Sequence, residues 1–332
     1  MPDPSVWVLV VIIILALGFG IVNGFNDAAN AIATVIGTRV LSPRNAIIMA
    51  AFFNLAGAAT GTAVARTIGK GILIPEAISY QTVVAALAAV IIWTTLATYR
   101  GLPVSLTHGF IAAMAAAGVA AVGTRAVDWG VLGKVASAVV SAPVLGFIGG
   151  FVLMIALLWI FRRSIPTKVR SLFGNLQILS AAFMAYSHGK NDGQMPIGVI
   201  TMAFVFYTGQ VALWENIPWW IIIVSALSIS MGTAIGGWRV IKTLGMRVTT
   251  LRPVHGFAAE VSAASVIEIA SHLGIPVSTT HCISSSIMGV GATRRLSAVR
   301  WGVAGNIVTA WIITFPVCGG LGYLFSWLLG LF

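Results

Sequence analysis

Two short motifs place carboxylates within otherwise apolar sequence. Asp27 follows an asparagine in NGFND (23–27), and Asp192 follows one in HGKND (188–192). Glycines in both motifs would loosen a helix, so that amide, carboxylate and backbone oxygens gather at one place. Such a set of oxygens without thiolates suits a hard cation, sodium rather than zinc or copper, and a proton carried by His188 is the rival interpretation. The candidate sodium ligands are Asn23, Asp27, Asn30, Asp192 and Glu260.

A second pair of motifs places hydroxyl groups at the start of apolar segments. GLPVSLTH (101–108) and GIPVSTTH (274–281) each contain a proline followed by serine and threonine. Proline and a capping hydroxyl at a helix start leave unpaired N–H groups, and the helix dipole attracts an anion such as phosphate or sulfate. The candidate anion-binding residues are Ser105, Thr107, Ser278, Thr279 and Thr280, with Asn26 and Asn191 nearby.

Simpler interpretations of the second pair stay open. Two ordinary N-caps would use the same residues, and His108 and His281 could either support the binding groups from behind or touch the ligand. His188 is a third candidate for a supporting role. A hydrolase pairing of serine with histidine is disfavoured, because an enzyme normally has one catalytic centre and here every element is doubled. We therefore expect no catalytic residue and no enzyme.

The composition indicates whether the elements that carry these motifs lie in water or in a membrane. Of 332 residues, 58% are hydrophobic and 8% are charged, whereas soluble domains carry about 25% charged residues. This excludes a soluble enzyme, a nucleic-acid-binding domain and a disordered chain. The net charge of +11 comes from basic residues in short breaks between apolar segments, where they act as orientation signals. The sequence predicts an all-α, multi-pass protein of the cell (plasma) membrane.

Ten long apolar stretches divide the chain, and we expect ten crossings of the bilayer. Those longer than 30 residues exceed a core of about 30 Å, so they must be broken, steeply tilted or folded as hairpins at the midplane. When sides alternate, one face receives 14 basic residues and the other 3, which predicts a cytoplasmic basic face and both termini extracytoplasmic. The stretches are 5–36, 46–65, 79–98, 103–123, 129–161, 174–209, 219–238, 253–273, 276–293 and 301–331.

The motifs also reveal an internal repeat. The paired motifs occur in the same order with offsets of 165 to 175 residues, and GxxxG pairs follow each aspartate motif at 57–61 and 232–236. We predict a first repeat over 1–161, a basic cytoplasmic connector over 162–173 and a second repeat over 174–332, interlocked as one transport unit. An odd number of crossings per repeat inverts the second half, as in secondary transporters that bind substrate and ions near the midplane. The GxxxG pairs indicate helix packing, with a homodimer face as an alternative.

Several of these motifs together resemble the inorganic phosphate transporter (PiT) family of sodium- and proton-coupled phosphate permeases. The resemblance lies in NGFNDAANAIATVIGT, AYSHGKNDGQMPIGV and GIPVSTTHC, the last preceded by GFAAE (256–260), and it covers nearly the whole chain. It implies phosphate uptake, with Asp27, Asp192, Glu260, Ser105 and Ser278 at positions that the family uses. One departure is Asn54, where many family members have glutamate, so the two halves are not chemically symmetric.

The combined expectation is a symporter that imports inorganic phosphate with sodium by alternating access, with no cofactor beyond the coupling ion. The alternatives are a proton-coupled or metal-phosphate symporter of the same family and, less favoured, a passive oxyanion channel or exchanger. The duplicated acids argue against the passive alternatives, which need no cation. The expected partners are inorganic phosphate, sodium ions and the lipid bilayer.

Overall fold

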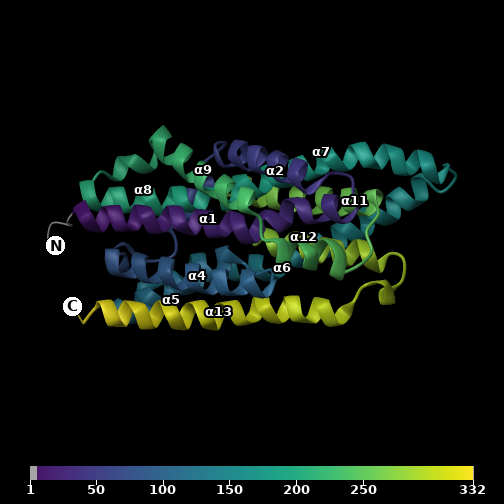
Figure 1. The fold of residues 1–332 in the computed structure, drawn as a ribbon. Helices are drawn as coiled ribbons and strands as arrows, with labels where there is room; N and C mark the ends of the chain where they lie inside the picture. The colour runs from purple at the N-terminus through teal and green to yellow at the C-terminus, as the bar shows by residue number, and fades with distance from the viewer. Residues whose placement is uncertain (1–5, 332) are drawn as a thin grey trace.

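The computed structural model describes residues 6–331 and is built from helices packed along one long axis (Figure 1). In the described residues there is no β-strand, only an isolated bridge between Leu73 and Val127. The α-helices are α1 (Val6–Gly37), α2 (Pro43–Ala58), α3 (Ala63–Lys70), α4 (Tyr80–Arg100), α5 (Leu106–Val122), α6 (Trp129–Ile160), α7 (Pro166–Asp192), α8 (Gln194–Thr208), α9 (Trp219–Ile235), α10 (Trp238–Lys242), α11 (Pro253–His272), α12 (Thr279–Ala292) and α13 (Trp301–Leu329).

The apolar stretches predict the helices closely, but their interruptions differ from the expectation. Of the four stretches longer than 30 residues, those at 5–36, 129–161 and 301–331 form the unbroken helices α1, α6 and α13, and only 174–209 is interrupted, at Gly193. Pro196 lies just after that break and has no N–H to donate to the carbonyl of Asp192 four residues earlier, whereas Pro143 and Pro316 lie within the unbroken α6 and α13. The first repeat has Ala31 at the matching place, so α1 continues through Asp27 and the expected loosening there does not occur.

The order of elements repeats along the chain. A long helix, a bent helix pair, a helix hairpin and a second long helix occur once in α1–α6 and again in α7–α13. The bent pairs are α2 with α3, at 72°, and α9 with α10 and the π-turn after it, at 63°. The connector predicted over 162–173 is shorter than expected, because α7 already begins at Pro166.

Two hairpins turn back near the middle of the molecule. α4 returns as α5 through Gly101, and α11 returns as α12 through Gly274 (Figure 1). Both glycines have positive φ, 73° and 67°, a conformation that other residues rarely adopt. The two tips meet where the Thr280 hydroxyl lies 3.2 Å from the carbonyl oxygen of Val104.

The hairpins explain why the prediction of ten crossings is wrong. Within residues 6–331, four helices could cross a membrane by length and composition, or six elements if each bent pair counts as one. The returning helices have 17 and 14 residues, or about 26 and 21 Å, which is too short for a core of about 30 Å. Counting apolar stretches treated both arms of each hairpin as full crossings, whereas α4 is the one hairpin arm among these candidate helices.

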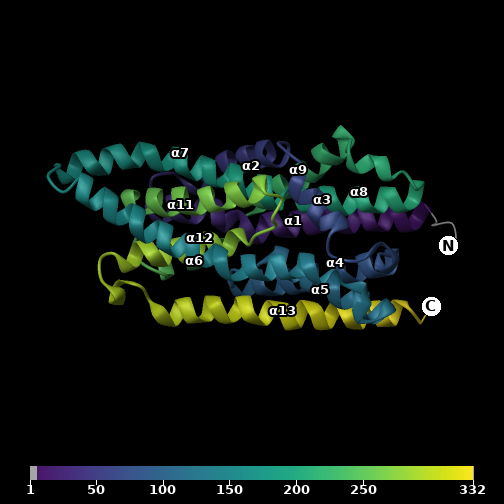
Figure 2. The same ribbon diagram turned by 180° about the vertical axis from the view of Figure 1, so that it is seen from behind.

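Elements of one half pack mainly against elements of the other. α5 lies along α13 and α6 along α12, and both views show α5 beside α13 (Figures 1 and 2). The expected GxxxG packing is internal: a Cβ on Gly57 would lie 2.0 Å from the Tyr186 carbonyl oxygen, and one on Gly232 would lie 2.0 Å from that of Ile21. These are repeat-equivalent contacts, α2 on α7 and α9 on α1. Gly57 and Gly232 are therefore covered within the chain, and a homodimer must use another surface.

Candidate functional site

One face of α1 carries the polar residues of the first aspartate motif. Asn23, Asn26, Asp27 and Asn30 follow the spacing that places helical residues on a single side, and all four are buried. The side-chain oxygens of the three asparagines accept no hydrogen bond from any other residue that the structure describes. A row of buried oxygens without donors is costly unless something electropositive contacts it.

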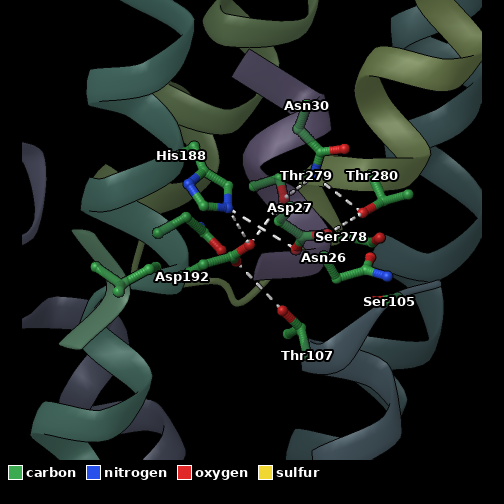
Figure 3. Close-up of polar contacts among 12 residues, drawn as sticks. Asn26, Asp27, Asn30, Ser105, Thr107, His188, Asp192, Ser278, Thr279 and Thr280 are labelled. Carbon is green, nitrogen blue, oxygen red and sulfur yellow. Dashed lines mark hydrogen bonds and ion pairs between the residues drawn. The ribbon is translucent and has the colours of Figure 1, made fainter. Parts of the chain in front are cut away.

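The two aspartates meet around one histidine. His188 Nε2 lies 3.2 Å from Asp192 Oδ2 and 3.8 Å from Asp27 Oδ2, and all three side chains are buried (Figure 3). One ligand atom from each residue lies within 4.8 Å of the other two, close enough to share a metal ion. The other ring nitrogen, Nδ1, contacts Asn54 Oδ1 at 2.7 Å.

The hairpin tips donate hydroxyl groups to these carboxylates. Asp192 accepts from Thr107 of the first hairpin at 3.3 Å and from Thr279 of the second at 2.7 Å. Asp27 accepts from Thr280 at 3.0 Å, and Asn30 donates to the hydroxyls of Thr279 and Thr280 (Figure 3). Two helix starts from different halves therefore face the same pair of acids.

Both motif serines cap the returning helices. Ser105 Oγ accepts from the backbone N–H of His108 at 3.2 Å, and Ser278 Oγ accepts from that of His281 at 3.1 Å. The N-capping alternative is therefore present in the structure. It does not exclude a ligand, because a hydroxyl that accepts a bond still has a hydrogen to donate.

The asparagines of the two motifs reach the hairpin tip of their own repeat. Asn26 donates to Thr98 Oγ1 at 2.7 Å and to the Leu102 carbonyl at 3.5 Å. Asn191 contacts the equivalent Ser271 Oγ at 2.9 Å, and the amide orientation that its neighbours favour also donates to Asp192 Oδ1 at 3.2 Å. The side-chain amides of both asparagines, expected near the anion, thus hold the tips in place. Asn26 does so through its nitrogen, and Asn191 accepts from Ser271 and donates to the Val277 carbonyl.

Two expected supporting residues lie together behind the tips. The His108 and His281 rings meet edge to face with centroids 4.8 Å apart, and they stack on Phe315 and Trp311 of α13, respectively. No hydrogen bond joins their ring nitrogens to another described side chain or backbone group. Their observed contacts are therefore aromatic packing between the hairpins and α13.

Glu260 belongs to a different buried cluster. Its carboxylate accepts hydrogen bonds from Thr34 of α1 and from Ser180 and Gln177 of α7, the last at 3.2 Å. The expectation that it joins the aspartates is thus not met by its contacts, because α11 presents it one helical turn beyond Asn30. Glu268, the fourth acid in an apolar stretch, pairs with Lys190.

Three contributors were missing from the expected site. Asn54 orients His188, while Thr98 and Ser271 fix the two hairpins through Asn26 and Asn191. The repeat contains a signal for the last two, since each hydroxyl residue stands three positions before the hairpin glycine, Gly101 or Gly274. Asn54 stands out in the sequence only as a departure from the family pattern, and its contact with His188 depends on α2 packing against α7.

The fold and the site together define a multi-pass membrane protein with a buried, oxygen-rich binding centre. The model of the phosphate transporter family matches residues 23–322, so this chain belongs to that family of inorganic phosphate transporters and is not an enzyme.

Relatives and a solved structure agree with this assignment. A probable low-affinity inorganic phosphate transporter of Rhizobium meliloti (strain 1021) is 43% identical over 93% of this chain and 92% of its own length. Its counterpart in Bacillus subtilis (strain 168) is 41% identical over 97% of both. A solved structure described as the sodium-dependent phosphate transporter superposes with a TM-score of 0.90 at 28% identity, covering 98% of this chain and 99% of that one.

Proposed function

We propose that this phosphate transporter is a symporter that couples phosphate import to sodium. The observation that carries the proposal is the set of buried asparagine oxygens of α1 without donors beside two adjacent carboxylates. Oxygen ligands of this kind suit a hard cation. The similar solved structure is described as sodium-dependent, which favours sodium.

Phosphate would bind between the hairpin tips. Ser105, Thr107, Ser278, Thr279 and Thr280 all stand at the first turn of α5 or α12, where unpaired N–H groups and the helix dipole favour an anion. Asp27 and Asp192 would repel phosphate from this position. Bound cations remove that repulsion, so phosphate affinity should rise with sodium, and sodium affinity with phosphate.

The membrane potential gives a second reason for joint transport. Moving one charge against 100 mV costs about 2.3 kcal/mol, so a phosphate dianion entering a negative cell would cost about twice that. Two or more sodium ions cancel this cost and add their own gradient. The charge balance thus requires cations in the same step.

Alternating access would follow from an inverted repeat. Support comes from the repeat-equivalent contacts of Gly57 and Gly232 and from hairpins that approach the aspartates from opposite ends of the molecule (Figure 1). α1 begins and α13 ends at the same end, as expected if both termini lie outside the cell. Because a hairpin adds no net crossing, the sides deduced from charge are unchanged except for Arg100 beside the first tip.

Proton coupling is the second candidate, and one contact favours it. His188 lies between both carboxylates, where it could carry a proton in place of a cation.

Uptake of labelled phosphate into proteoliposomes distinguishes sodium coupling from proton coupling. An inward sodium gradient should drive uptake at constant pH, and an inward proton gradient without sodium should not. Uptake driven equally by protons alone would remove sodium from the proposal.

The same assay tests the cation site. Asp27→Asn and Asp192→Asn should each abolish gradient-driven uptake while the protein remains folded, because the neutral amide cannot balance the cation charge. Asp128→Asn is the matched control, since Asp128 caps α6 at a surface position. Normal uptake by both site variants would falsify the cation-site assignment.

A further inference from the structure

A cavity at the basic end of the molecule has no part in the proposed transport centre. It measures about 550 Å³ and lies where the segment before α11 meets the segment between α12 and α13. Its lining consists of Thr249, Thr250, Arg252, Arg294, Arg295, Ser297, Ala298 and Arg300. No acidic residue lines it, and within residues 6–331 none of its four arginines forms an ion pair.

Two arginines of the cavity lining, Arg252 and Arg300, stand immediately before long helices. Arg252 occupies the N-cap position of α11 and Arg300 that of α13. His255 Nδ1 accepts from the Arg252 N–H at 3.1 Å, and the Arg300 guanidinium donates to the carbonyls of Met246 and Arg247 at 2.9 and 3.1 Å. The equivalent helices of the first half, α4 and α6, begin with the capping residues Ser79 and Asp128. Arginine is a poor choice beside the positive end of a helix dipole, so the fold itself does not call for it.

One backbone hydrogen bond beside the cavity has an equivalent in the first half of the chain, at the opposite end of the molecule. The N–H of Arg300 donates to the Val248 carbonyl at 2.9 Å, as the N–H of Asp128 donates to that of Ile72 at 3.1 Å. A preference for basic residues on the cytoplasmic side explains arginines at this end. It does not explain why four of them surround one cavity together with three hydroxyl residues.

We propose that this arginine pocket binds a phosphate group, carried either by the headgroup of an anionic phospholipid or by free inorganic phosphate. Arginine forms paired hydrogen bonds with phosphate oxygens, and the three hydroxyl residues of the lining, Thr249, Thr250 and Ser297, add further donors. Basic pockets between membrane helices on the cytoplasmic side are typical sites for anionic headgroups. The pocket is also large enough for more than a bare phosphate ion.

Occupancy of the pocket would act on the second hairpin. Arg252 begins α11, and Arg294 and Arg295 follow α12, so a bound phosphate group joins both roots of the hairpin whose tip carries Ser278. This consequence for transport depends on the function proposed above. The binding itself does not, and it can be measured without transport.

Thermal unfolding of the purified full chain in detergent tests the binding. Phosphatidylglycerol in the micelles should raise Tm by about 2–4 °C relative to phosphatidylcholine, because a ligand of the folded state stabilises it. In a separate arm, inorganic phosphate replaces chloride at equal ionic strength. Each arm compares the wild type with R294Q/R295Q and with R163Q/K168Q, which removes two exposed charges of the same end outside the pocket.

The arms distinguish the two sources of phosphate. If the ligand is a lipid headgroup, R294Q/R295Q loses the shift caused by phosphatidylglycerol and keeps the one caused by inorganic phosphate. If the ligand is free phosphate, the Tm shift caused by inorganic phosphate is smaller in R294Q/R295Q than in the wild type. The shift that remains comes from phosphate bound at the transport centre. Should the double variant fail to fold, R294Q and R295Q are measured singly. The proposal is overturned if the pocket variants keep both shifts in full, or if R163Q/K168Q loses as much.

Discussion

At the scale of single residues, the centre combines carboxylates whose negative charge needs a counterion with asparagine side chains that lack hydrogen-bond partners. Asp27 and Asp192 receive hydroxyl groups from both hairpins and share His188, so their contacts stabilise part of the negative charge. Asn23 has neither an acceptor for its amide nitrogen nor a donor for its oxygen. Function rather than stability is the simpler reason for such a residue at a buried position.

Replacing Asn23 with alanine therefore separates binding from folding. The change removes a buried polar group without breaking a hydrogen bond, so Tm in sodium-free buffer should stay the same or rise. The sodium concentration for half-maximal uptake should increase about tenfold, which corresponds to about 1.4 kcal/mol. Asn306→Ala, at an exposed position of α13, should change neither quantity. A fall in Tm together with unchanged sodium dependence would show that Asn23 is structural.

The sequence could predict the buried acids but not their partners. An aspartate in an apolar stretch is visible in any composition profile, and its duplication marks both copies. The hydroxyl groups that reach each acid come from hairpins distant in the chain, such as Thr280 for Asp27. The separate position of Glu260 could not be predicted for the same reason, because its place on α11 relative to α1 depends on tertiary packing.

At the scale of elements, the returning helices α5 and α12 position the proposed phosphate donors. Each begins at the hairpin tip with a serine cap, and each meets the acids through its first turn. The apolar stretches predicted these helices within a few residues. Their depth could not be predicted, because hydrophobicity does not distinguish an arm that ends at the midplane from one that crosses.

Serine caps allow a matched comparison between site and scaffold. Ser105→Ala, Ser278→Ala and Ser79→Ala each remove an N-cap and should cost about 1 kcal/mol of stability. Only the first two also remove a donor to phosphate, worth about 1.5–3 kcal/mol for a charged acceptor, so their KM for phosphate should rise tenfold or more. Uptake kinetics and Tm on the same preparations check this. An equal rise in KM for Ser79→Ala would assign the effect to lost helix stability.

At the scale of the whole molecule, charge predicts orientation even though the crossing count was wrong. A hairpin that enters and leaves the bilayer on the same side removes two expected crossings together, which leaves every later segment on its original side. The basic loop between α6 and α7 and the loop before α6 should therefore face opposite sides of the membrane.

Single cysteines test this orientation in intact cells. Arg125→Cys should react with a membrane-impermeant maleimide from outside, and Arg163→Cys only after the membrane is opened, since both positions are exposed and the charge pattern predicts opposite sides for them. The native Cys282 and Cys318 are both buried and provide an unreactive background. The reverse labelling pattern would place both termini in the cytoplasm.

The packing of α5 against α13 also has a consequence for biosynthesis. About 180 residues separate the end of α5 from the start of α13, which the ribosome needs about 9–36 s to make at about 5–20 residues per second. During that time the first hairpin holds a polar turn within the bilayer before its covering helix exists. Newly made chains must therefore be shielded by the insertion machinery, and the two halves expressed as separate polypeptides should mature only when both are present in the same cell.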